Sequence, residues 1–235
     1  MSDAGSRNGW TRVAFGDVVR QVRDRVDPEN SGLERYVAGE HMDTGDLRIR
    51  RWGSVGDGYL GPAFHMRFRP GHVLYGSRRT YLRKVAIAEF EGITANTTFV
   101  LEPKNPNVLL PDLLPFVMRS ERFHEHSIKQ SKGSVNPYVN FSDLTWYEFS
   151  LPPLEEQKRL AASLGAFQVA VERQRQAQRE VGDTADYVLN QLIDTTLLKD
   201  RDFITWRAEQ PSQPTPVAAE RQAVIGSATS ADKHV

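Results

Sequence analysis

The chain has 235 residues, a formal net charge of zero and no cysteine. Its length allows one medium-sized domain with an appendage, and the lack of cysteine excludes disulfides, thiolate metal sites and a cysteine nucleophile. The segment from Met1 to Asn8 is polar, and no apolar run approaches the roughly 18 residues of a membrane helix. We therefore expect a cytoplasmic protein that does not enter the membrane.

The zero net charge hides an uneven arrangement of charges along the chain. No acidic residue occurs from Gly58 to Ala88, whereas acids gather from Asp17 to Asp46 and in the C-terminal third. The basic residues of the acid-free window are Arg67, Arg69, Arg78, Arg79, Arg83 and Lys84. Such a window is typical of a nucleic-acid-binding face, but arginines scattered over the solvated face of a sheet explain it equally well.

Residues 9–151 predict an α+β domain, a globular unit built from short strands and a helix. Four short runs have the length and residue types of strands, namely Ala63–Phe68, His72–Tyr75, Val85–Phe90 and Thr97–Leu101. Arg69-Pro70-Gly71 supplies the turn between the first two runs. The segment from Pro111 to Gln130 has apolar residues at roughly helical spacing, which predicts one helix inside the domain.

The chain changes character at Leu151-Pro152-Pro153-Leu154, because two consecutive prolines end one element before the next begins. From Leu160 onward, seam positions follow at alternating steps of four and three residues, the 3.5-residue repeat of a coiled coil. We therefore predict one long coiled-coil helix over residues 152–198 that dimerises and docks a partner. Its expected apolar contact residues are Leu160, Leu164, Phe167, Val171, Val181, Val188 and Leu192.

Two further statements concern this C-terminal part. The alternative to a projecting coiled coil is an amphipathic helix that packs back on its own domain. Residues 209–235 are poor in large apolar side chains and cannot offset their ordering entropy, so we expect a disordered tail.

Motifs that carry catalysis are not recognisable. Gly56 to Gly61 matches the phosphate-binding pattern Gly-x-Gly-x-x-Gly, but Pro62 and a strand-like run follow where a helix should open. His124 and His126 would point to different faces of a helix, which argues against a metal site. We expect no catalytic residue, metal or cofactor in this chain, and an enzyme with an unrecognised site stays a minor alternative.

Two basic, loop-like stretches are candidates for DNA contact. They run from Tyr75 to Lys84 and from Lys129 to Tyr138. Arginine can pair with guanine edges, asparagine with adenine, and lysine and serine can hold phosphates. The expected DNA-binding residues are Tyr75, Ser77, Arg78, Arg79, Tyr81, Arg83, Lys84, Lys129, Lys132, Ser134 and Asn136.

Three segments together form a recognisable set: Gly9 to Val19, Phe68 to Lys84, and Phe149 to Leu160. The third contains the fairly specific string Leu-Pro-Pro-Leu-Glu-Glu-Gln. With these segments the sequence resembles the specificity subunit of type I restriction-modification systems, over roughly residues 9–198. The resemblance implies a non-catalytic subunit with a target recognition domain that reads double-stranded DNA. It also implies adenine methyltransferase partners that take S-adenosylmethionine, and a restriction and translocation subunit that joins them in phage defence.

The family's usual subunit carries two recognition domains and two helices, whereas one of each is expected here. A homodimer would reproduce that layout and would read an interrupted palindrome, because target symmetry follows protein symmetry. A heterodimer with a different half subunit would read two unlike half-sites. The alternative from another functional class is a helical scaffold or inhibitor that mimics the specificity subunit without reading DNA.

Overall fold

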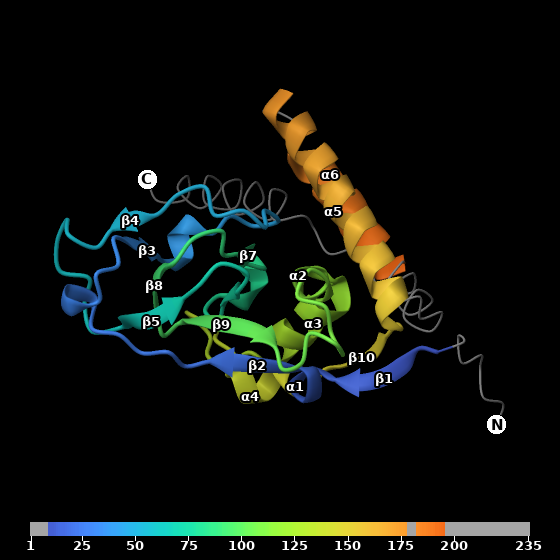
Figure 1. Ribbon diagram of the computed structural model, residues 1–235, viewed down its shortest axis with the longest axis horizontal. Coiled ribbons are helices and arrows are strands. Elements are labelled where there is room, and N and C mark those ends of the chain that lie inside the picture. Colours follow the sequence, from blue (N-terminus) through green and yellow to red (C-terminus); the bar gives the residue numbers. More distant parts are fainter. Residues whose placement is uncertain (1–8, 178–181, 196–235) are drawn as a thin grey trace, which may run out of the picture. The chain divides into compact units, whose positions relative to one another are not determined.

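The computed structural model describes residues 9–177 and 182–195 (Figure 1). Its elements, with 3-10 helices written η, are β1 (Thr11–Ala14), α1 (Phe15–Val18), β2 (Val19–Val22), η1 (Pro28–Asn30), β3 (Arg35–Val37), η2 (Gly39–His41), β4 (Gly53–Ser54), β5 (Phe64–Phe68), β6 (Val73–Gly76), η3 (Thr80–Leu82), β7 (Val85–Ile87), β8 (Gly92–Ala95), β9 (Thr98–Pro103), α2 (Leu114–Arg119), α3 (Glu121–Gln130), α4 (Phe141–Leu144), β10 (Glu148–Leu151), α5 (Leu154–Ala177) and α6 (Gly182–Ile193). This mixture confirms the α+β expectation. The tail predicted over residues 209–235 lies outside the described residues.

Two four-stranded sheets form the body of the domain. One has the order β2-β9-β6-β7, and the other β4-β3-β8-β5. All pairs are antiparallel except β3 with β8. The four strands expected from the sequence are β5, β6, β7 and β9, with ends that differ by up to three residues. The expected turn between β5 and β6 is also present, with Gly71 at φ 88° and His72 Nδ1 accepting the Arg69 N–H.

The sheet β2-β9-β6-β7 is buried on both faces, and its side chains alternate between two apolar cores. On β6, Val73 and Tyr75 pack into a core shared with α2 and α3, whereas Leu74 packs between the two sheets. On β9, Leu101 faces the helices and Val100 faces the second sheet. The domain therefore has three layers, helices on one side and the second sheet on the other.

The helix expected over 111–130 is two helices. α2 ends at Arg119, and Ser120 adopts an extended backbone (φ −61°, ψ 145°) before α3 begins. The Ser120 hydroxyl accepts a hydrogen bond from the Phe123 N–H, which satisfies one free donor of the first turn. This N-cap separates the helices, so the prediction of one uninterrupted helix is wrong.

The two ends of the recognition domain lie together. β1 pairs with β10 in an antiparallel two-stranded sheet. Next to this sheet, the Trp10 indole donates to the Glu156 carboxylate at 2.8 Å. A Cβ on Gly9 (φ 91°) would lie 2.9 Å from Pro153 Cγ, so this approach requires glycine. The segments that begin and end the domain are therefore in direct contact.

Gln157 connects the start of α5 to the domain. Its side chain is 1% exposed. Its Oε1 accepts the Leu110 N–H at 2.9 Å, and its Nε2 donates to the carbonyls of Val108 and Pro152, both at 2.8 Å. This glutamine of the Leu-Pro-Pro-Leu-Glu-Glu-Gln string thus satisfies three backbone groups.

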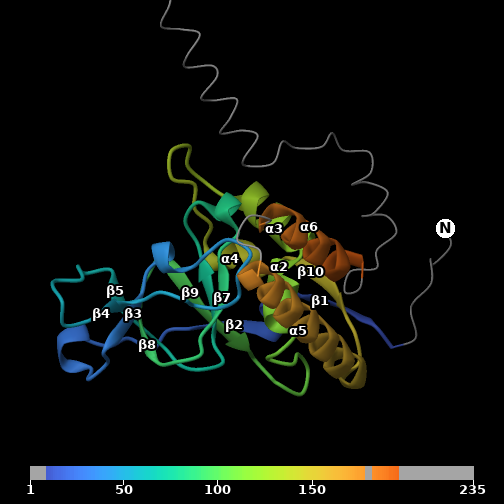
Figure 2. The ribbon, with the colours of Figure 1, turned by 90° about the horizontal axis from the view of Figure 1, so that it is seen from above.

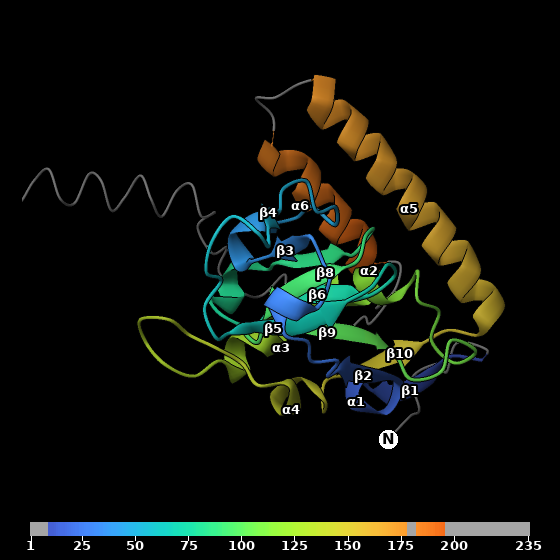
Figure 3. The same ribbon diagram turned by 60° about the vertical axis from the view of Figure 1, so that its left-hand side comes forward.

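The predicted single helix over 152–198 is wrong, because the chain reverses between two helices. Arg119 contacts Gln168 at 2.6 Å, and the N–H of Glu121 donates to Asp194 at 2.8 Å. In one straight helix Gln168 and Asp194 would lie about 39 Å apart, yet both meet one short junction. α5 and α6 also contact each other, and α6 contacts α2 (Figure 3). We call α5 and α6 together the helical arm.

The apolar face of α6 explains this reversal. Leu189 and Ile193 are fully buried in the core that also contains Ala161 and Leu164 of α5. The seam expected from the sequence instead places Val188 and Leu192 inward, and these are 49% and 37% exposed. On α6 the buried positions therefore lie one residue after the positions that the repeat predicts. The alternative of an amphipathic helix that packs on its own domain describes this part correctly.

Candidate nucleic-acid interface

The two stretches expected to contact DNA lie side by side (Figure 2). The first follows β6 and contains η3, and the second follows α3. The Arg79 N–H donates to the Pro137 carbonyl at 2.6 Å, and the Val139 N–H donates to the Ser77 carbonyl at 3.0 Å. Arg78 forms an isolated bridge with Tyr138. We call this joined surface, residues 77–84 and 129–138, the paired loops.

Arg78 is held in place by an aromatic ring. Its side chain is exposed, and its guanidinium carbon lies 4.7 Å from the ring centroid of Tyr138. A cation–π contact of this kind restricts the guanidinium without occupying its N–H donors. Arg78 is therefore presented to solvent with its hydrogen-bonding groups available.

The backbone around η3 adopts a conformation that non-glycine residues rarely take. Arg79 and Arg83, which flank the 3-10 helix, have φ values of 49° and 51°. Left-handed backbone at such residues costs energy and persists where the surroundings enforce it. Arg83 is fixed by two hydrogen bonds to the buried carboxylate of Glu121, at 2.5 and 2.6 Å. This pair holds the first loop against the start of α3.

The cations of the paired loops differ in how far they are neutralised. Lys132 pairs with Asp143 at 3.0 Å. Lys84 donates to the Gly39 carbonyl, and partial burial lowers its pKa. In the described part of the chain, the exposed Arg78, Arg79 and Lys129 lie at ion-pair distance from no carboxylate. These three residues carry the positive charge that an anionic ligand would meet.

Other exposed side chains of the paired loops are uncharged. Tyr81 is 51% exposed and Val135 is 85% exposed. Ser134 and Asn136 are also exposed. Tyr138 and Val135 were not among the residues predicted to contact DNA, although Tyr138 ends the second stretch. The contact of Glu121 with Arg83 had no signal in the sequence, since 38 residues separate the two partners.

Two predicted contact residues are not at the surface, which corrects the sequence-based expectation. Tyr75 is fully buried on β6, and its hydroxyl lies within hydrogen-bond distance of the Ser127 hydroxyl. Burial raises the pKa of Tyr75 to about 12. Ser77 is 5% exposed and donates to the Thr97 carbonyl. Both belong to the sheet and its end, so neither can contact DNA in this fold.

The arginines at the start of the acid-free window are also paired. Arg67 contacts Glu91, and Arg69 contacts Asp24 at 2.7 Å. Their partners lie outside the window in sequence but next to it in space. The basic character of the window is therefore confined to its second half, which forms the first of the paired loops.

The residues predicted to contact a partner helix fall into two groups, buried or half-buried residues of α5 and exposed residues of α6. Leu164 and Val171 are buried, while Leu160 and Phe167 are half-buried against the core that the sheet shares with α2 and α3. Val188 and Leu192 are exposed on α6. Val181 lies outside the described residues. The described α5 seam thus packs within the chain, and α6 presents the exposed apolar side chains.

Within the described ranges, histidine and acidic side chains form no group of three or more that could hold a metal ion. No helix described there combines the length and apolar character needed to cross a membrane. The side chains of the paired loops offer cationic, hydrogen-bonding and aromatic contacts.

Comparison with known proteins decides the family. Residues 36–180 match the type I restriction modification DNA specificity domain. The chain belongs to this family. The matched region of the specificity domain contains both paired loops and all of α5. Over 211 residues the chain is 24% identical to the type I restriction enzyme EcoDI specificity subunit of Escherichia coli, and this covers 87% of the chain and 45% of the relative.

Solved structures share the fold of this specificity domain. The HsdS subunit from Thermoanaerobacter tengcongensis superimposes with a TM-score of 0.61 at 22% identity, covering 92% of the chain and 54% of that subunit. The S subunit of a type I restriction-modification system from M. genitalium gives 0.50 at 14% identity, with coverages of 73% and 42%. The chain spans about half the length of the relatives it matches.

Proposed function

We propose that the chain is a non-catalytic DNA specificity subunit, which reads double-stranded DNA through the paired loops and directs a DNA adenine methyltransferase to its target. The observation that carries the proposal is that two basic loops, far apart in sequence, join into one surface that displays Arg78, Arg79 and Lys129, and none of the three has a carboxylate partner among the described residues. The family to which the chain belongs supports the same assignment.

The chemistry of this surface suits DNA. Arginine and lysine side chains meet phosphates, and arginine can also donate two hydrogen bonds to the major-groove edge of guanine. Arg78 stacks on Tyr138 with its N–H groups available, and this geometry favours base contact. Asn136 and Ser134 are exposed on the neighbouring loop, where an amide could pair with adenine. Arg79 and Lys129 are assigned to phosphates.

The test is the salt dependence of binding to a mixed-sequence DNA duplex, measured by fluorescence anisotropy. Replacing Arg79 and Lys129 by alanine removes the two cations that we assign to phosphates. If both neutralise phosphates, the slope of log affinity against log salt falls by about 1.8, at about 0.9 for each contact. The matched control is Arg12→Ala with Arg20→Ala, which removes the same charge from exposed ion pairs on β1 and β2.

The outcomes separate the candidate functions. A reduced slope in the loop variant and an unchanged slope in the control support reading by the paired loops. Equal slopes in both variants would remove this surface from the proposal. Absence of DNA binding by the parent chain would favour a scaffold that occupies the methyltransferase without reading DNA.

The partners are proposed from the relatives and from the helical arm. The EcoDI relative is named as the specificity subunit of a restriction enzyme, and another similar chain comes from work on complex assembly of a type I restriction-modification system. We propose that the helical arm binds the methyltransferase, which would take S-adenosylmethionine as its cofactor. A restriction and translocation subunit would join this complex. Copurification of the methyltransferase with the intact chain tests this assignment.

A homodimer is the proposed assembly, with the exposed face of α6 as the contact. Tyr187, Val188 and Leu192 lie exposed on this helix, and a second copy would cover them. Two identical domains related by a two-fold axis would read an interrupted palindrome. Light scattering should show a dimer, and Val188→Glu with Leu192→Glu should give a monomer. A monomeric parent, or an asymmetric bipartite target, would exclude the homodimer.

A further inference from the structure

The segment before β4 presents arginines to the helical arm. From Leu47 to Arg50 the side chains alternate as on a strand, with Leu47 and Ile49 buried in the two cores and Arg48 and Arg50 at the surface. The segment is fixed to β7 because the Ile87 N–H donates to the Leu47 carbonyl at 2.7 Å. Its backbone is thus anchored in the recognition domain while its two arginines face outward.

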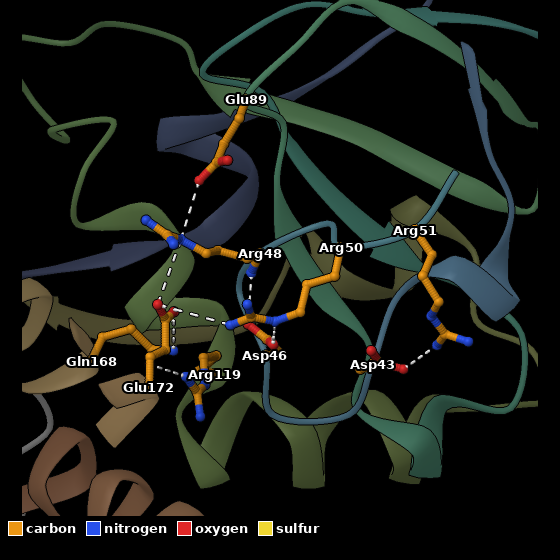
Figure 4. Close-up of polar contacts among 9 residues, drawn as sticks. All are labelled: Asp43, Asp46, Arg48, Arg50, Arg51, Glu89, Arg119, Gln168 and Glu172. Carbon is orange, nitrogen blue, oxygen red and sulfur yellow. Dashed lines mark hydrogen bonds and ion pairs between the residues drawn. The ribbon is translucent and has the colours of Figure 1, made fainter. Parts of the chain in front are cut away.

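The arm meets these arginines with a buried carboxylate (Figure 4). Glu172 on α5 is 7% exposed, and its Oε2 lies 3.5 Å from Arg48 Nε and 3.9 Å from Arg50 Nη2. Arg48 also contacts Glu89 at 3.4 Å. Arg50 donates to Asp46 at 2.6 Å, and this hydrogen bond raises the pKa of its guanidinium. Carboxylates of the recognition domain, Glu89 and Asp46, therefore orient both arginines.

Gln168 extends the network by one helical turn. Its Nε2 donates to Glu172 Oε1 at 3.2 Å, and its Oε1 accepts from Arg119 Nη1 at 2.6 Å. Arg119 ends α2, next to the junction whose Glu121 N–H donates to Asp194 of α6. The domain thus contacts both helices of the arm through hydrogen-bonded and charged groups. We call Arg48, Arg50, Arg119, Gln168 and Glu172 the polar clamp.

The polar clamp differs in character from the base of α5. At the base, Ala161 and Leu164 pack in the apolar core, and Gln157 fixes the first turn. Apolar packing resists separation but is not directional, whereas hydrogen bonds and ion pairs require defined positions of their partners. One and two turns beyond Leu164, Gln168 and Glu172 therefore add directional contacts to the apolar packing of α5, which continues through Phe167 and Val171.

We propose that Glu172 and Gln168 are positioning residues, which set the orientation of the helical arm relative to the domain that carries the paired loops. The proposal rests on the proposed function in one respect: if the paired loops read DNA, the polar clamp fixes the offset between the bases that are read and the partner that the arm carries. Its structural part can be tested without DNA.

The absence of cysteine allows two spin labels to be placed without background. The labels are attached at Asn96→Cys and Gln174→Cys. Asn96 is exposed between β8 and β9, and Gln174 is exposed on α5, beyond the polar clamp. Double electron–electron resonance on the doubly labelled full chain, mixed with an excess of unlabelled chain so that labelled copies do not pair, should give one narrow distance distribution. Glu172→Gln with Gln168→Ala should shift and broaden it, since Glu172→Gln removes the charge that faces both arginines.

The matched control is Glu155→Gln, which removes an exposed carboxylate from the same helix, where it pairs with Lys158. This variant should leave the distance distribution unchanged. If the clamp variant also leaves it unchanged while remaining folded by circular dichroism, the positioning role is overturned. Should the double variant fail to fold, Glu172→Gln alone, which preserves the side-chain shape, provides the same measurement.

The functional readout is the preferred gap between half-sites in a library of bipartite duplexes. The clamp variant should accept a wider range of gaps than the parent, and Glu155→Gln should not. A parent that binds no DNA would contradict the proposed function and leave the distance result standing. If the distance distribution shifts but the preferred gap does not change, the polar clamp orients the arm but does not set the gap between half-sites.

Discussion

Gln157→Leu should destabilise the chain, because it removes the amide that satisfies three backbone groups at the start of α5. The Leu110 N–H loses its acceptor, and the Val108 and Pro152 carbonyls lose a donor. A buried polar group left without its partner costs about 1–3 kcal/mol. Val108 is 43% exposed, so water can replace the donor there. Counting the other two groups, we expect a loss of about 3 kcal/mol in the free energy of unfolding.

Urea denaturation followed by circular dichroism measures this loss. Gln174→Leu is the matched control, because it makes the same chemical change on an exposed position of the same helix. Exposed substitutions of this kind change stability by less than about 0.5 kcal/mol. If Gln157→Leu unfolded at the same urea concentration as the control, the three hydrogen bonds would not explain why glutamine occupies this position.

Three further predictions concern the buried groups of the domain. Tyr75→Phe should cost about 1 kcal/mol through the lost contact with Ser127, should remove one phenol that titrates near pH 12 in ultraviolet absorbance, and should leave DNA affinity unchanged. Burial lowers the pKa of His124 well below 6.5, so stability should be complete above that pH and decrease below it, and His124→Asn should flatten this decrease in urea titrations at several pH values. Gly92→Ala would place a Cβ 2.7 Å from the Phe68 ring and from a carbonyl of β3, and thermal unfolding should show a loss of about 1–3 kcal/mol.

Local composition was sufficient to predict three strands of the buried sheet, β6, β7 and β9, but not β2. β6 and β9 are short runs of branched and aromatic residues, whose length and residue types are those of strands. The first and last residues of the helices and strands were harder to predict, because they depend on single contacts. Tyr75 ended the strand expected over His72–Tyr75 and also began the basic stretch expected to contact DNA, and β6 extends one residue further, to Gly76. Ser120 divides α2 from α3 through one N-cap, which a helical pattern of apolar residues does not reveal.

The helical arm shows the limit of periodicity as evidence. A step of four and three residues continues through α5 and α6, but α6 buries Leu189 and Ile193, one position after the expected seam. A repeat indicates that one face is apolar and does not say which surface covers it. Likewise, both loops were identified from their charge, but their pairing through Arg78 and Tyr138 joins residues that are 60 positions apart and could not be predicted locally.

The pairing of β1 with β10 has a consequence for how the protein can vary. The polypeptide passes into the recognition domain and out of it through two adjacent strands, and Trp10 and Glu156 join the flanking segments directly. A folded unit whose two ends are neighbours can be exchanged as one piece, because its replacement alters no path elsewhere in the chain. The segment between Ala14 and Glu148 can therefore be exchanged as one piece if its replacement keeps the groups that hold the arm. These are the backbone of Val108 and Leu110, which Gln157 contacts, and the side chains of Arg48, Arg50 and Arg119.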